Sequence, residues 1–237
     1  MIVAIHQPNY LPWLGFFNKM ARSDVFVLFD DVQLVRGKSF VTRNRVKIPN
    51  NIQWLTVPVK DKGDLIQIKD ARINQDGKWQ KSHWRTIQLA YARASYFKKY
   101  QSGFSQIYAT PWESLQELNI ALINLIKDLL GIGTRLVLSS EMSIRSEGSR
   151  KIMAILRELN ADCYLSGEGK GSKRYIDEEE FRQNNIELIF QGFEHPAYGQ
   201  LWGDFVPNLS VIDLLFNEGE KSRDIIMQRS LKPSLIG

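Results

Sequence analysis

Two short apolar segments near the N-terminus constrain the fold most strongly. Residues 2–5 and 25–29 have the length and composition of buried strands, and residues 12–22 between them fit a helix with Pro12 in its first turn. A strand, a helix and a strand in this order begin a βαβ unit, in which the two strands are parallel. A parallel sheet is buried on both faces, so the chain must also supply the helices that cover it.

The second half of the chain repeats this alternation. Strands are expected at residues 135–139, 163–166 and 186–190, and helices at residues 149–160 and 177–184. A long leucine-rich helix is expected to precede them, with Thr110 as its N-cap, Pro111 as its first residue and Glu113 completing a capping box. Gly131 is expected to end this helix.

The middle of the chain has a different pattern. Residues 52–59 and 65–73 read as two antiparallel strands, and the helical period that follows turns His83 inward. We therefore expect an α/β fold, with a mixed, largely parallel sheet covered by helices, Rossmann-like or HUP-like, and a small antiparallel and helical insertion. The expected organisation is a single domain, residues 1–237, with an inserted subdomain at residues 60–110.

Composition excludes several classes of protein. No apolar run approaches the roughly 18 residues of a membrane-spanning helix, and the N-terminus lacks the pattern of a signal peptide, so a cytoplasmic protein without a membrane span is expected. The single cysteine, Cys163, excludes an intrachain disulfide and a multi-cysteine metal site. A net charge of +5 is small compared with the positive charge expected of a dedicated nucleic-acid-binding protein.

The loop after the first expected strand has the composition of a ligand-binding site. In open α/β sheets, ligands bind beyond the carboxyl ends of the strands, and His6 lies at such an end. Histidine titrates near neutrality, so His6 is a candidate catalytic base. The neighbours expected to bind substrate are Gln7, Asn9, Tyr10 and Trp13.

Charged residues follow the second expected strand. Asp30 and Asp31 are adjacent on an extended chain and point to opposite faces, so only one of them can face a cleft. Further on, the alternation of a basic segment places Arg43 and Arg45 on one face and Asn44 on the other. Arginine forks suit bidentate contacts to phosphate, and an amide offers both a donor and an acceptor.

Two later loops also follow expected strands, and three such loops can converge on one cleft. Alternating glycines let backbone N–H groups approach an anion. The candidate ligand-binding residues of the first of these loops are Ser166, Gly167, Gly169, Lys170 and Tyr175. The last loop repeats the composition of the opening one and contributes His195, Tyr198 and Gln200. The three histidines match no local zinc motif, so no metal site is expected.

The motifs of the chain, taken in order, resemble those of a known family. The segments IHQPNYLPWLGFFNKM, FDDVQ, TRNRVK, WLTVPV, YLSGEGKGSKRYI and NLSVIDLLFNEG resemble the WbqC-like family of bacterial proteins over nearly the whole chain. The resemblance implies a role in O-antigen, lipopolysaccharide or other surface polysaccharide biosynthesis, and a glycine transferase activity has been suggested for the family. It marks His6, Gln7, Pro8, Tyr10, Pro12, Trp13, Gly15, Asp31, Arg43, Asn44, His83, Ser166, Gly167, Tyr175, Tyr198, Gln200 and Asp213.

The main functional hypothesis is a transferase that acylates the amino group of a nucleotide-linked amino sugar, with glycyl transfer as one form of the reaction. The acyl donor stays open among acyl-CoA, aminoacyl-tRNA and an acyl adenylate made from ATP, so tRNA is a candidate partner. Asp31 is a candidate catalytic residue together with His6 and His83. The other expected roles are a base from His6 or His83, an oxyanion donor from Asn44 or Gln7, phosphate contacts from Arg43, Arg45 and Lys170, and a stacking platform from Trp13 or Tyr10.

Two other functions stay open. The opening strand, histidine, helix and strand also look like the start of a nucleotidyl or adenylyl transferase of the HIGH-type fold, although the second histidine of that motif is missing. The third reading is a carbohydrate-binding or RNA-binding module without catalysis, in which the tryptophans and the basic segment serve recognition.

Overall fold

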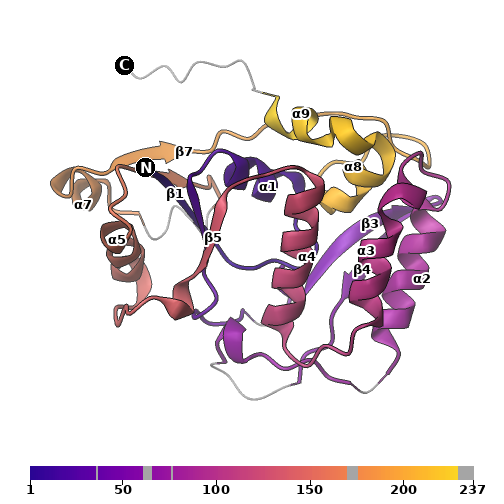
Figure 1. Ribbon diagram of the computed structural model, residues 1–237, viewed down its shortest axis with the longest axis horizontal. Coiled ribbons are helices and arrows are strands. Elements are labelled where there is room, and N and C mark those ends of the chain that lie inside the picture. The colour runs from indigo at the N-terminus through magenta and orange to yellow at the C-terminus, as the bar shows by residue number, and fades with distance from the viewer. Residues whose placement is uncertain (36, 61–65, 76, 170–175, 229–237) are drawn as a thin grey trace.

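A five-stranded, wholly parallel sheet forms the centre of the protein. The computed structural model describes residues 1–35, 37–60, 66–75, 77–169 and 176–228 (Figure 1). In spatial order the strands are β5 (Arg135–Leu138), β2 (Val25–Leu28), β1 (Ile2–His6), β6 (Cys163–Ser166) and β7 (Glu187–Phe190). The expected α/β class is confirmed, and the five predicted strands of the sheet are present.

Strand β1 is the middle strand of the sheet, with two strands on either side of it. Val3 lies beside Val25 of β2 on one edge and beside Tyr164 of β6 on the other. Its backbone groups are therefore satisfied within the sheet, and its apolar side chains can be buried on both faces.

Successive side chains of the strands point alternately into two apolar cores, one on each face of the sheet. Ala4 and Leu165 point into the larger core, whereas Val3 and Ile5 point into the smaller one. The larger core is covered by α1 (Leu14–Ala21), α4 (Leu115–Leu129), α8 (Val211–Glu218) and α9 (Ser222–Met227). The smaller core is covered by α5 (Gly148–Glu158) and α7 (Glu178–Gln183).

The chain between β2 and β5 forms the insertion. It contains the antiparallel pair β3 (Arg43–Ile48) and β4 (Asn51–Thr56), the short helix η1 (Ile68–Asp70), and the helices α2 (Trp79–Tyr91) and α3 (Phe97–Ala109). The remaining short helices are η2 (Ser139–Glu141) and η3 (Gly219–Lys221). In Figure 1, α5 and α7 lie at one end of the molecule and α2 and α3 at the other. The division into a domain and a subdomain at residues 60–110 stays a prediction.

The antiparallel pairing expected between residues 52–59 and 65–73 is present only as a bridge between Val59 and Ile73, and the extended antiparallel pair lies elsewhere. Strand β4 pairs with β3, which precedes it, so that Arg45 faces Trp54, and residues 68–70 form a helical turn instead of a strand. Asn50 adopts a φ of 62° between the two strands, which permits a very tight turn. The sequence of β3 is too polar to stand out as an apolar strand, and this explains the error.

The start of α4 is also corrected. Its N-cap is Ser114, whose hydroxyl accepts a hydrogen bond from the Glu117 N–H at 3.3 Å. Thr110, the expected cap, instead donates to the Gln106 carbonyl at 2.9 Å, at the end of α3. Both segments carry a hydroxyl residue followed three positions later by a glutamate, so this spacing alone could not choose between them. The predicted end of α4 is confirmed, with Gly131 at a φ of 61°.

Replacing Ser114 by alanine tests this cap. Ser114→Ala should lower the free energy of unfolding by about 1 kcal/mol, because the first turn of α4 loses its side-chain acceptor. Urea denaturation measures the difference. Ser102→Ala, at an exposed position inside α3, is the matched control and should change stability by less than about 0.5 kcal/mol. Equal effects of the two substitutions would contradict the assignment.

Candidate functional site

The order of the strands identifies where a ligand can enter. The chain passes from β1 to β2 and β5 on one side, then returns to β6 and β7 on the other side of β1. Connections that leave two neighbouring strands in opposite directions open a crevice at the carboxyl ends of those strands. For this strand order, the rule predicts a crevice beyond β1 and β6. The register of Ala4 with Leu165, extended along both strands, brings His6 next to Gly167.

A polar residue lies at the end of each strand of the sheet or within two positions after it. The residues are His6 at the end of β1, Asp30 after β2, Ser139 after β5, Ser166 at the end of β6 and Gln191 after β7. Their surroundings divide them into two groups, because some are fully engaged with other protein groups and others are not.

Asp30 belongs to the engaged group. It is completely buried. Its carboxylate accepts hydrogen bonds from the Ser140 N–H at 2.9 Å, from the Ser140 hydroxyl at 2.5 Å and from the Gln116 amide. The Ser139 hydroxyl lies 2.9 Å from the same carboxylate. With these donors from η2, which follows β5, and from α4, Asp30 holds the end of β2 to its neighbours.

Asp31, a predicted catalytic residue, forms an ion pair with Lys151 of α5. Both side chains are almost completely buried, at 11% and 8% exposed, and the Ser139 hydroxyl lies 2.5 Å from the Asp31 carboxylate. An ion pair of this kind is costly to break, because either partner would be left as a buried, unpaired charge. The arrangement joins α5 to the end of β2, and a catalytic role of Asp31 stays a prediction.

His6 belongs to the second group. Its Nδ1 lies 3.0 Å from the Gln7 carbonyl, and its ring packs edge-on against Phe16 at 5.0 Å. A carbonyl oxygen only accepts, so Nδ1 carries the proton and Nε2 has a free lone pair. None of the residues that the structure describes forms a hydrogen bond with Nε2. His6 can therefore accept a proton or a hydrogen bond from a ligand in the crevice.

A lysine that sequence reasoning missed lies beside His6. Lys19 of α1 is only 3% exposed and donates to the Ile5 carbonyl at 2.9 Å. Burial lowers the pKa of Lys19 to about 7. Burial, followed by the charge of Lys19, lowers the pKa of His6 to about 3, so the imidazole is neutral at physiological pH. The only signal in the sequence was a lysine within the apolar segment that forms α1.

The opening loop is held in place by groups that were expected to bind substrate. The Asn44 amide donates to the Leu11 carbonyl at 2.6 Å, and its oxygen accepts from the Arg45 N–H at 2.9 Å. Leu11 has a φ of 43°, so Asn44 stabilises a backbone conformation that leucine rarely adopts. Asn44 is 1% exposed. Its amide is thus occupied, and a role as oxyanion donor stays untested.

The opening loop and the loop after β7 lie together, as predicted for converging loops. The Trp13 ring meets Phe193 edge-on at 5.4 Å. A Cβ at Gly15 would come within 2.3 Å of the Trp13 ring, so glycine is required there. Gln191 completes the contact, since its amide donates to the Gly15 carbonyl at 2.7 Å. Asn9, another predicted binding residue, is buried at 6% exposure.

His195 lies farther along the same loop. Its Nδ1 is 2.9 Å from the Pro196 carbonyl, and its ring stacks near Tyr198 at 6.2 Å. Burial lowers the pKa of His195, and its buried Nε2 has no partner among the described residues. His195 is therefore neutral and, like His6, has a free acceptor nitrogen.

Tyr198 and Gln200 take part in a buried network away from the crevice. Tyr198 and Tyr91 both donate to the Asp213 carboxylate at 2.9 Å. Burial raises the pKa of Asp213 to about 6. The Lys47 ammonium donates to the Gln200 side chain at 3.2 Å. This network joins β3, α2 and α8 to the loop that contains Tyr198, so these two residues support that loop.

His83 and Tyr10 lie in the apolar core. The Tyr10 hydroxyl lies 2.9 Å from His83 Nδ1 and 2.5 Å from the Tyr108 hydroxyl. Burial lowers the pKa of His83 to about 4. His83 is 7% exposed, and its ring packs against Tyr10, Trp79 and Tyr108, whereas the His6 ring packs against Phe16. The structure thus keeps His6 and His83 apart, whereas both were candidates for one catalytic base.

The two arginines of β3 share one face of the hairpin, which confirms the alternation read from the sequence. The Arg43 guanidinium lies 4.2 Å from the Trp54 ring centre, and its buried Nε has no partner in the described chain. Arg45 donates to the carbonyls of Asn208 and Pro207 at 3.1 and 3.2 Å. Arg45 is thus occupied in holding a loop, and Arg43 is the freer of the two.

The glycine-rich loop is described only in part. Ser166 is completely buried, and its hydroxyl donates to the Gly167 carbonyl at 3.2 Å. Gly169 is exposed. The predictions for Lys170 and Tyr175 fall outside the residues that the structure describes. Within the described ranges, no three His, Cys, Asp or Glu side chains gather as metal ligands would.

Comparison with known proteins gives the family. The model of the WbqC-like protein family matches residues 7–225. The chain belongs to the WbqC-like protein family. It is 34% identical over 226 residues to the uncharacterized protein Rv1507c of Mycobacterium tuberculosis, and the match covers 94% of this chain and 96% of that protein. No solved structure matches this WbqC-like chain. The resemblance in the sequence motifs is confirmed.

None of the helices in the described part of this WbqC-like chain is long and apolar enough to cross a membrane.

The buried state of His83 predicts a pH dependence of stability. The folded-state pKa of about 4 lies below the ordinary value of 6.5, so the folded protein resists protonation. This stability is fully present above pH 6.5 and is lost as the pH falls toward 4, by about 3 kcal/mol in total. Urea denaturation at several pH values should show a shallower acid loss in His83→Gln than in the wild type. Parallel curves would contradict a buried, neutral His83.

Proposed function

We propose that this WbqC-like protein is a group-transfer enzyme that binds a nucleotide-linked amino sugar at the crevice beyond β1 and β6 and acylates its amino group. The observation that carries the proposal is the strand order, because the chain leaves β1 and β6 in opposite directions and ligands of open α/β sheets bind at such switch points. Family membership supports the association with surface polysaccharide synthesis.

The loop after β6 suits the phosphates of such a substrate. The chain leaves β6 through Ser166, Gly167 and Gly169, and the last of these is exposed. Glycines let backbone N–H groups approach phosphate oxygens closely, since no Cβ intervenes. The aromatic pair of Trp13 and Phe193 gives the opposite side of the crevice an apolar surface for the sugar or the base.

His6 is suited to act as the base for the amino group of the sugar. As the amine nitrogen attacks the acyl carbon, it forms the new N–C bond and loses a proton, while the leaving group departs with the electrons of the old bond. The free Nε2 lone pair of His6 is placed to accept that proton. The low pKa of His6 keeps this nitrogen unprotonated before the reaction but makes it a weak base, so it suits the acidic N–H of the tetrahedral intermediate and not a free ammonium group. The identity of the acyl donor stays open among acyl-CoA, aminoacyl-tRNA and an acyl adenylate.

An exposed aromatic surface favours a second candidate function, the binding of a carbohydrate or single-stranded RNA without catalysis. Phe40 and Trp54 are 49% and 38% exposed, and their rings lie 6.1 Å apart. The Arg43 guanidinium packs over Trp54. Exposed rings beside a cation are a common platform for sugars and bases.

A thermal-shift screen with amino sugars linked to uridine or guanosine diphosphate tests the proposal. A ligand that binds only the folded protein stabilises it by about 2.7 kcal/mol at 100 times its dissociation constant. We expect such a shift in the wild type and its loss or strong reduction in His6→Gln. The control variant is Arg135→Ala, exposed at the other end of the sheet, which should keep the full shift.

The other outcomes separate the alternatives. A shift with ATP alone that is lost in His6→Gln would favour adenylyl transfer. No shift with any nucleotide sugar, together with salt-sensitive RNA binding that Trp54→Ala removes, would favour the binding module. Equal ligand shifts in His6→Gln and the wild type would reject the assigned site.

A further inference from the structure

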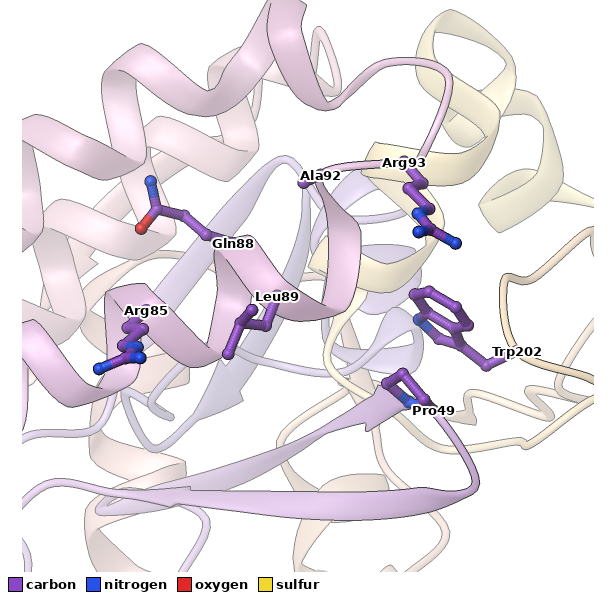
Figure 2. A pocket seen from close by; sticks show the side chains of 7 residues that line it. All are labelled: Pro49, Arg85, Gln88, Leu89, Ala92, Arg93 and Trp202. Atoms are coloured by element: carbon purple, nitrogen blue, oxygen red, sulfur yellow. The ribbon is translucent and has the colours of Figure 1, made fainter.

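A second groove lies far from the crevice, between α2, the tip of the β3–β4 hairpin and the loop that contains Trp202. It has a volume of about 580 Å³, within the range of small-molecule sites. Its lining consists of Pro49, Arg85, Gln88, Leu89, Ala92, Arg93 and Trp202 (Figure 2). Nothing in the proposed acyl transfer uses these residues.

The charge of the groove is positive and uncompensated. None of the described residues that line it carries a carboxylate. In the part of the chain that the structure describes, neither Arg85 nor Arg93 forms an ion pair, and both side chains are exposed. Figure 2 shows the two arginines at separate ends of the groove. They are eight positions apart along α2 and just past its end, a rise of roughly 12 Å. The groove thus offers two cationic ends.

An apolar surface lies between the two arginines. Leu89 is 66% exposed, so its side chain is accessible to a ligand in the groove. The Trp202 ring stands between Arg93 and Pro49, and the Arg93 guanidinium lies 5.8 Å from the ring centre (Figure 2). Gln88 adds an amide, which can both donate and accept hydrogen bonds. The ligand should therefore be an elongated anion with a flat apolar part and polar edges.

The walls of the groove are fixed before any ligand arrives. The Trp202 indole N–H donates to the Ala90 carbonyl at 2.8 Å, and Trp202 has a φ of 66°, which is strained for a bulky residue. The Lys47 ammonium donates to the carbonyls of Gly203 and Asp204 at 3.2 and 2.5 Å. Tyr91, the last residue of α2, donates a hydrogen bond to the Asp213 carboxylate. Strained backbone that is held so firmly is characteristic of ligand sites.

We propose that this groove binds a nucleoside phosphate. A base or nucleoside covers Leu89 and the edge of Trp202, Gln88 meets the polar edge of the base or the ribose, and the phosphates reach an arginine. The site is separate from the crevice beyond β1 and β6, and the proposal does not rest on the proposed acyl transfer.

Calorimetric titration with adenosine diphosphate tests the proposal. We expect saturable binding to the wild-type protein and at least a tenfold loss of affinity in the double variant Arg85→Gln/Arg93→Gln. The matched control is Arg145→Gln/Arg150→Gln, which removes the same charge from exposed positions near and on α5, and it should bind as the wild type does. His6→Gln should also bind normally, which separates this groove from the crevice.

Two further probes define the ligand class. Trp202→Phe should reduce the change in tryptophan fluorescence on binding, which locates the nucleotide. Adenosine and pyrophosphate should each bind at least tenfold more weakly than adenosine diphosphate, since each lacks one half of the ligand. Equal affinity of the two double variants, equally tight binding of pyrophosphate, or binding of RNA without binding of adenosine diphosphate would overturn the proposal.

Discussion

The pairing of β1 on both edges is the constraint on which the rest of the structure depends. With β2 on one side and β6 on the other, β1 is buried on both faces and must be covered by two helical layers. The same arrangement sends the loops after β1 and β6 in opposite directions, which predicts a ligand crevice between them. The geometry of the candidate site thus follows from the way in which the core is built.

The polar groups of this protein fall into two classes. Some form hydrogen bonds or ion pairs with other protein groups, and others keep a donor or acceptor that a ligand can use. Asp31 and Lys151 form an ion pair, Asp30 accepts hydrogen bonds from η2 and α4, and Lys47 donates to loop carbonyls. Buried charges survive only with such partners, so these groups hold elements together. His6 is different, because one of its ring nitrogens has no partner among the described residues. This asymmetry distinguishes the crevice from the structural networks around it.

The sequence predicted elements well where the signal was local. The apolar runs of the central strands and the end of α4 at Gly131 were found, whereas β3 was missed because its polar residues are buried or engaged through contacts with distant segments. For the same reason His6 and Asp31 could be placed at strand ends, but their neighbours Lys19 and Lys151 could not be identified. A lysine within a helix normally suggests a solvated face, and only the tertiary structure shows that these two are buried.

The most direct test of the central claim, that substrate binds between the loops after β1 and β6, is hydrogen–deuterium exchange with and without an amino sugar linked to uridine diphosphate. The account predicts slower exchange in peptides that cover residues 6–13 and 163–169, since bound ligand orders both loops. Peptides from α7 should not change. Protection confined to residues 85–93, or to the hairpin of β3 and β4, would place the sugar nucleotide elsewhere and contradict the account.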